Sequence, residues 1–234
     1  MQVHEGDVVL PGDIAVDIPK CASTTKVVLG PGLYNENDTV LINKCGILRK
    51  KSPNTYWVDC QQKRYIPSRG ETVLGTVVNK GGDVFKVDIG ASEHASLSYL
   101  AFEGATKKNR PDVNIGDVIF AKLLIASRDL EPELVCVDSH GKKGKLGVVS
   151  DGFVFNCSLN LVRKILNPKC PLLKALAKEY PYEIAAGMNG KIWIKARSTR
   201  ETIAIANAIL AAEFVVEEEI VKMCENVALS AAGF

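Results

Sequence analysis

The first third of the chain alternates short apolar segments with turn residues and shows no helical period. Strand-type segments are predicted at residues 7–10, 26–29, 39–42, 56–60 and 63–66. Turn sequences such as Pro11-Gly12-Asp13 separate them, because proline and glycine favour tight turns. So short an all-β unit buries little core by itself, and we therefore expect it to dock against another surface.

Residues 70–147 repeat glycine-punctuated strands with a period of two. Between residues 83 and 89 this period places Phe85, Val87 and Ile89 inside and Lys86 outside. In the segment 118–126 it places Ile125 inside as well. Five short strands with glycine at the corners predict a closed five-stranded OB barrel.

Residues 146–234 mix helical and strand patterns. A hairpin is predicted around Ser150-Asp151-Gly152, followed by helices at 158–166 and 171–180. A second hairpin joins the strands 182–186 and 191–195, and a capping box at Ser198 to Glu201 opens a long helix. A last helix is predicted at 216–229. The order β, α, α, β, β, α is that of a KH domain, which makes the chain a multi-domain α+β protein.

Composition describes an ordinary soluble globular protein with 47% hydrophobic and 24% charged residues, and its length of 234 residues predicts two or three small domains. Its apolar runs are too short for a transmembrane helix, so no membrane association is expected. The polar start, His4 to Asp7, argues against a secretory signal. The net charge of +2 excludes a protein that holds nucleic acid by overall charge alone.

Seven cysteines at irregular spacing indicate reduced, mostly buried thiols in an intracellular protein. No metal site and no other cofactor are expected, because His4, His94 and His140 lie near no cysteine pair. Nucleophile, zinc-protease and P-loop motifs are absent from the sequence, as are spaced acidic clusters for two metal ions. We therefore predict no catalytic residues.

The tetrad Gly187-Met188-Asn189-Gly190 has two interpretations. Asn-Gly between apolar alternations predicts a type I′ hairpin, because both turn residues must tolerate positive φ. A Gly-x-x-Gly loop is also the phosphate clamp of KH domains, although that clamp joins two helices. Here the helices are joined by residues 167–170, which contain no glycine pair. We favour a structural hairpin, with Trp193 as an anchor near the junction of the KH and OB domains.

Several spaced motifs together carry a family resemblance. They occupy residues 8–13, 30–32, 65–67, 96–100, 102–111, 116–117 and 187–193. On these motifs the chain resembles, over nearly its full length, the S1–KH cap subunits of the eukaryotic RNA exosome. The resemblance implies an N-terminal β domain at 1–68, an S1-type OB-fold β-barrel at 69–145 and a C-terminal KH domain at 146–234.

The resemblance also implies a non-catalytic role in RNA processing and degradation, including that of ribosomal RNA. Three cap proteins would sit on a ring of six RNase PH-like subunits and form the RNA entry pore, and an associated nuclease would cut the RNA from 3′ to 5′. The implied partners are the ring subunits, the other cap subunits and single-stranded RNA. The implied location is the nucleus, the nucleolus and the cytoplasm.

Candidate RNA contacts are electrostatic: Lys86, Lys107, Lys108 and Arg110. S1 domains usually stack RNA on an exposed aromatic and a histidine, and those positions correspond here to Val84 and Ser96. The loop that carries the last three cations lines a pore in one interpretation and is a solvated connector in the other.

We predict that residues 1–67 are the main docking module for the ring, with Pro11, Gly12 and Asp13 as candidate docking residues. The alternative function is a free-standing OB–KH RNA-binding factor in translation or transcription. The near-neutral charge, the missing aromatics and the additional β domain favour a scaffold subunit.

Overall fold

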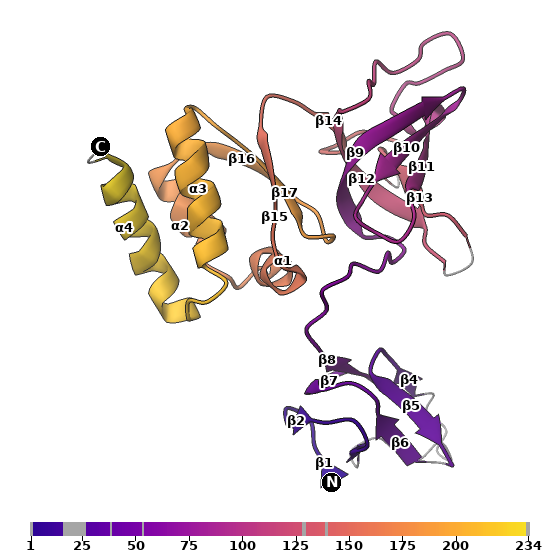
Figure 1. Cartoon of the computed structure of the whole chain (residues 1–234), viewed down its shortest axis with the longest axis vertical. Coiled ribbons are helices and arrows are strands. Elements are labelled where there is room, and N and C mark those ends of the chain that lie inside the picture. Colours follow the sequence, from indigo (N-terminus) through magenta and orange to yellow (C-terminus); the bar gives the residue numbers. More distant parts are fainter. Residues whose placement is uncertain are drawn as a thin grey trace. The chain divides into compact units, whose positions relative to one another are not determined.

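The structure is a computed structural model that describes residues 2–15, 27–37, 39–52, 54–127, 130–138 and 140–232. Lys26, in the second predicted strand, and Cys21 lie outside these ranges. The chain divides into two compact units, residues 1–62 and 63–234 (Figure 1). The first unit contains strands, and the second contains a barrel followed by a mixed helix and strand fold. The predicted multi-domain α+β class is confirmed.

Two four-stranded sheets build the first unit. One has the order β1 (Gln2–Val3), β3 (Ile14–Ala15), β6 (Thr39–Ile42), β5 (Leu33–Glu36), and the other β2 (Val8–Val9), β7 (Gly46–Lys51), β8 (Thr55–Asp59), β4 (Val28–Leu29). Buried residues from both sheets, including Val9, Ile42, Leu48 and Tyr56, form one core. The all-β prediction is confirmed for the described residues.

The strand predicted at 63–66 is wrong. That segment pairs with no sheet, and Tyr65 instead packs into the core of the barrel, where its hydroxyl donates to Glu71 Oε2 at 2.6 Å. The apolar pattern that predicts a strand comes from the buried side chain of Tyr65 in an irregular segment.

The barrel consists of five strands of the second unit: β9 (Thr72–Gly81), β10 (Val84–Asp88), β11 (Ala95–Ser98), β12 (Val118–Ile125) and β13 (Glu133–Val135). The sheet order is β13-β11-β10-β9-β12, and pairing between β12 and β13 closes it. A short 3-10 helix, η1 (Tyr99–Ala101), follows β11. Phe85, Val87 and Ile89 are buried inside, as their alternation predicts. The five-stranded barrel is confirmed.

Two details of this region differ from the sequence prediction. Ile125 is 36% exposed, because the register between β12 and β13 shifts after Leu123 and ends the alternation. Residues 150–152 do not connect a hairpin: β14 (Gly147–Val149) pairs with β12, whereas β15 (Phe153–Asn156) pairs with β17. The chain leaves one sheet and enters another at this turn.

The C-terminal part has the order β15, α1 (Leu159–Leu166), α2 (Leu172–Glu179), β16 (Tyr182–Ala186), β17 (Lys191–Ala196), α3 (Thr199–Ala211), η2 (Glu217–Glu219) and α4 (Ile220–Ala232). The three strands form an antiparallel sheet with β17 in the centre. The hydroxyls of Ser158 and Ser198 cap α1 and α3. The predicted KH order is confirmed.

The two faces of the central strand β17 pack against different parts of the second unit. Ile192 and Ile194 point into the core that the helices form, whereas Trp193 points to the opposite face and packs with Leu74 of the barrel. Figure 1 shows the strands of this sheet between the helices and the barrel. The hairpin of β16 and β17 therefore lies where the two folds meet. Within the described chain, no helix has the length and apolar character needed to span a membrane.

Candidate nucleic-acid interface

The loop between β16 and β17 spans residues 187–190, and the pairing of Gly187 with Lys191 leaves three residues in the turn between them. Gly187 N donates to Lys191 O at 2.9 Å, and Gly190 N donates to Gly187 O at 3.1 Å. Gly190 has a φ of 82°, whereas Asn189 is not among the residues of positive φ. The predicted type I′ turn is therefore wrong. The extra loop residue leaves Gly190 alone to take the left-handed conformation, as in hairpins that end in a glycine bulge.

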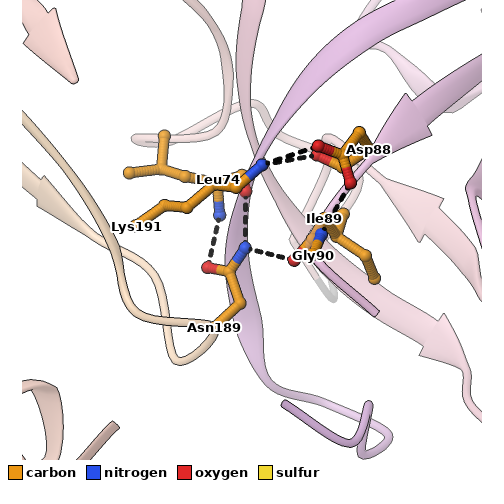
Figure 2. A network of polar contacts seen from close by, with 6 residues as sticks. All are labelled: Leu74, Asp88, Ile89, Gly90, Asn189 and Lys191. Carbon is orange, nitrogen blue, oxygen red and sulfur yellow. Dashed lines mark hydrogen bonds and ion pairs between the residues drawn. The ribbon is translucent and has the colours of Figure 1, made fainter. Parts of the chain in front are cut away.

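Asn189 is buried against the barrel, with 9% of its surface exposed. Its Nδ2 donates to Leu74 O and to Ile89 O, both at 2.7 Å, and its Oδ1 accepts from Leu74 N at 3.3 Å (Figure 2). Met188 N adds a bond to Thr72 O at 2.8 Å. Buried polar groups need such partners, so this side chain and loop hold the hairpin on β9 and on the end of β10.

The two glycines of the tetrad serve close packing. A Cβ at Gly187 would lie 2.6 Å from Leu74 N, and one at Gly190 would lie 2.7 Å from Cys157 O. Both residues are buried. A phosphate clamp needs backbone N–H groups that are free to donate, and those of Gly187, Met188 and Gly190 already donate within the protein. The geometry favours the structural interpretation of the tetrad.

An ion pair lies beside this loop. Lys191 Nζ is 3.1 Å from Asp88 O and 3.1 Å from Asp88 Oδ2 (Figure 2). Burial acts to raise the pKa of Asp88, but the hydrogen bond from Gly90 N and the ammonium of Lys191 outweigh it, so the pKa lies below its usual range. Neither residue is among the predicted site residues, because the two members of an interdomain ion pair share no local sequence pattern.

Trp193 lies at the contact between the KH sheet and the barrel. It is 6% exposed and forms a small core with Leu74 and Ala185. Gly152 leaves room for the indole, since a Cβ there would overlap the ring. Leu74 is also fully buried although it lies on the outer side of β9. An apolar residue at an outward position was the available signal that this face is covered.

The loop after η1 presents two lysines and anchors a third cation. Lys107 and Lys108 are exposed at its tip, where Thr106 N donates to Asn109 O at 3.0 Å. Arg110 turns back to the barrel: its Nη2 lies 3.1 Å from Asp83 Oδ1, and its guanidinium lies 4.8 Å from the centre of the Tyr99 ring. Arg110 thus holds the loop in place, and the two lysines are available to solvent.

Lys86 lies apart from this loop, on the outer face of β10. Its ammonium forms an ion pair with Glu131. On the same face Val84 pairs with Ser98, and Lys86 pairs with Ser96, while Phe85 points into the core. These positions offer no ring for base stacking, which single-strand-binding OB folds normally use.

Pro11, Gly12 and Asp13 form a tight turn in the first unit. Asp13 N donates to Leu10 O at 3.1 Å, and Gly12 has a φ of 94°, as a type II turn with proline and glycine at its centre requires. A hydrogen bond from Leu10 N to the carboxylate lowers the pKa of Asp13. No described atom lies within 4 Å of a Cβ placed on Gly12, so the glycine serves the turn conformation.

Two further properties concern the chemistry of the described part of the chain. It contains no group of three or more His, Cys, Asp and Glu side chains placed to hold a metal ion. Burial raises the pKa values of the Cys136 and Cys157 thiols to about 12. These thiols are therefore protonated at neutral pH and behave as core side chains.

An OB barrel fixed to a KH fold through a buried hairpin, with a separate β unit before it, defines an S1–KH protein. Family models match each part: "Exosome complex component RRP40, S1 domain" at residues 65–147, "KH domain" at 152–200 and "Mammalian exosome complex component RRP40, N-terminal" at 7–61. The chain belongs to the exosome complex component RRP40 family, as the sequence resemblance predicts.

Relatives of the same name support this membership. The Drosophila melanogaster protein is 57% identical over 94% of this chain and 94% of its own length. The Homo sapiens protein is 45% identical over 92% and 87%, and the Saccharomyces cerevisiae protein 38% over 86% and 87%. A crystal structure named as that of an exosome complex RNA-binding protein shares the fold, with a TM-score of 0.59 and 24% identity over 70% of this chain and 97% of that one.

Proposed function

We propose that this chain is a non-catalytic cap subunit of the RNA exosome that stabilises the ring and forms part of the RNA entry pore. Its partners would be the RNase PH-like ring subunits, the other cap subunits and single-stranded RNA. An associated nuclease would degrade or process the RNA from 3′ to 5′, including ribosomal RNA. We expect the complex in the nucleus, the nucleolus and the cytoplasm.

Membership of the RRP40 family along nearly the whole chain is the observation that carries this proposal. It argues against the alternative, a free-standing OB–KH factor of translation or transcription. The geometry adds a physical reason for a shared rather than autonomous RNA contact. The Gly-x-x-Gly loop is buried against the barrel, and Val84 and Ser96 supply no ring for stacking. RNA contact would then depend on exposed lysines, and such binding is weak and salt-dependent.

Reconstitution of the exosome tests the pore role. We expect the Lys107→Ala/Lys108→Ala variant to assemble normally and to protect a shorter length of RNA from added nuclease, because the two exposed ammonium groups no longer meet phosphates. Arg110 should be left in place, since it anchors the loop to Asp83. Equal RNA protection by variant and wild-type complexes would reject the pore role for this loop.

A further inference from the structure

A second basic loop lies beside the one that carries Lys107 and Lys108. It follows the last barrel strand and contains Lys142, Lys143 and Lys145. Lys143 N donates to Glu103 Oε2 at 2.8 Å, a contact between residues 40 positions apart in the sequence. Cys136 N donates to Ala101 O at 2.9 Å, which ties the start of this segment to η1. The two loops are therefore fixed next to each other on the barrel.

The second loop has a defined conformation. The carboxylate of Asp138 accepts from His140 N at 2.8 Å and from Lys142 N at 3.0 Å. Gly141 and Gly144 take positive φ values of 74° and 54°, which allow the chain to turn twice within a few residues. Leu146, 8% exposed, then enters the barrel core and fixes the end of the loop. The backbone that carries these lysines is therefore held in one conformation before any ligand arrives.

Charge gathers at these two loops, although the chain as a whole carries only +2. Residues 102–112 and 138–147 together contain six basic and three acidic side chains. Two of the acids, Glu103 and Asp138, already accept backbone N–H groups of the second loop. All five lysines of the two loops are exposed (Lys107, Lys108, Lys142, Lys143 and Lys145).

We propose that these five lysines form one binding surface for the phosphate backbone of single-stranded RNA, hereafter the two-loop surface. The proposal rests on the proposed function and extends the RNA contact to a loop that follows the last strand of the barrel. Recognition would rest mainly on charge, because neither loop exposes a Phe, Tyr or Trp ring: Phe102 is partly buried and packs edge-on against Phe85. The imidazole of His140 is exposed on the second loop, and stacking of a base on it would add no sequence preference. RNA would therefore bind without sequence preference.

The test measures binding of the purified full chain to a fluorescent oligouridylate of about 16 nucleotides, the largest site size of one OB fold. Lys142→Gln/Lys145→Gln should weaken binding about 5- to 25-fold at low salt and reduce the slope of log affinity against log salt by about 1.4, since each phosphate contact on a single strand contributes about 0.7. Lys143 stays unchanged, because its Cε lies 2.8 Å from the position of a Gly147 Cβ and its side chain packs there.

Two control variants separate local charge from overall charge. Lys174→Gln/Lys178→Gln removes the same charge from exposed positions of α2 and should leave the salt slope unchanged. Lys142→Arg/Lys145→Arg keeps the charge and should keep the affinity. Equal melting temperatures of all variants would show that the fold is intact.

The other outcomes are distinguishable. Wild-type affinity and slope for Lys142→Gln/Lys145→Gln, with weakened binding for Lys107→Gln/Lys108→Gln, would overturn the two-loop surface and leave the proposed function standing. Unchanged binding for both pairs would reject RNA contact by either loop. Failure of Lys142→Gln/Lys145→Gln to enter the reconstituted exosome, at unchanged RNA affinity, would show that the second loop binds a protein partner and would also overturn the proposal.

Discussion

Single residues at the junction of barrel and KH fold show which local signals are ambiguous. Asn-Gly predicts a type I′ turn, yet Asn189 has no positive φ and uses its amide to bind Leu74 and Ile89. In this protein the Asn-Gly dipeptide therefore supplies a side chain that hydrogen-bonds to another domain. Sequence spacing locates the hairpin correctly, but a side chain's distant partner has no local pattern.

Trp193 gives the first prediction at this scale. Trp193→Ala should lower the free energy of unfolding by about 3–5 kcal/mol, the usual cost of emptying a buried aromatic site. The indole is 6% exposed and packs between Leu74 and Ala185. Denaturant unfolding checks this value, with Phe214→Ala as the control, because Phe214 is 88% exposed and should change stability little. A loss below about 1 kcal/mol for Trp193→Ala would show that the site is not tightly packed.

The ion pair of Asp88 and Lys191 predicts a pH effect. The pKa of Asp88 is lower in the folded chain than the unfolded value of about 3.9. Its stabilisation is therefore present above pH about 4 and is lost as the pH falls through the folded pKa. Melting temperatures of wild type and Asp88→Asn should differ at pH 7, and the difference should shrink as the pH falls below about 4. A constant difference across this range would contradict the role of the charged carboxylate.

Elements are largely predictable from periodicity and caps, and their sheet partners are not. Alternation places Phe85 and Val87 inside the barrel, and a serine cap opens α3, as predicted. A serine also caps α1. The turn at residues 150–152 carries the same local signal whether its strands pair with each other or, as here, with two different sheets. Whether the two strands form a hairpin or join different sheets depends on strands that are distant in sequence, so the local sequence does not predict it.

The hairpin of β16 and β17 predicts an outcome at the level of an element. Gly187→Asp should lower the melting temperature, because its side chain would collide with Leu74 N, 2.6 Å from the Cβ position. Any loss of RNA binding should then follow from the loss of stability. Gly81→Asp is the matched control: it adds the same charge where the nearest atom is 4.0 Å away. An unchanged melting temperature of Gly187→Asp together with lost RNA binding would instead favour the phosphate clamp.

The chain divides into two compact units, and we propose that the first docks on the ring and the second contacts RNA. Composition predicts the need for partners, because a chain with a net charge of +2 holds RNA poorly by charge alone. What composition does not show is the clustering of lysines on two loops that are distant in sequence. Their adjacency follows from two long-range contacts, that of Lys143 N with Glu103 and that of Cys136 N with Ala101 O. The boundaries of the three domains and the docking residues stay predictions.

Removal of the first unit tests whether docking belongs to the first unit and RNA contact to the second. A chain that begins at Lys63 keeps Tyr65 in the barrel core and should therefore fold, whereas a cut after residue 67 would remove this side chain. We expect the shortened chain to bind RNA as the full chain does and to fail to enter the exosome. Size-exclusion chromatography of the reconstituted mixture measures incorporation, and normal assembly of the shortened chain would reject the first unit as the main docking module.

A finer version of this experiment uses Gly12→Ala. Its φ of 94° is a conformation that alanine rarely adopts, so the turn of Pro11 and Asp13 should shift while the described surroundings leave room for the added methyl group. We expect lower incorporation into the exosome at unchanged RNA affinity. Pro11→Ala, which keeps the glycine, should have a smaller effect, because it mainly loosens the turn. If Gly12→Ala reduced RNA affinity and incorporation equally, the two activities would not divide between the two units as proposed.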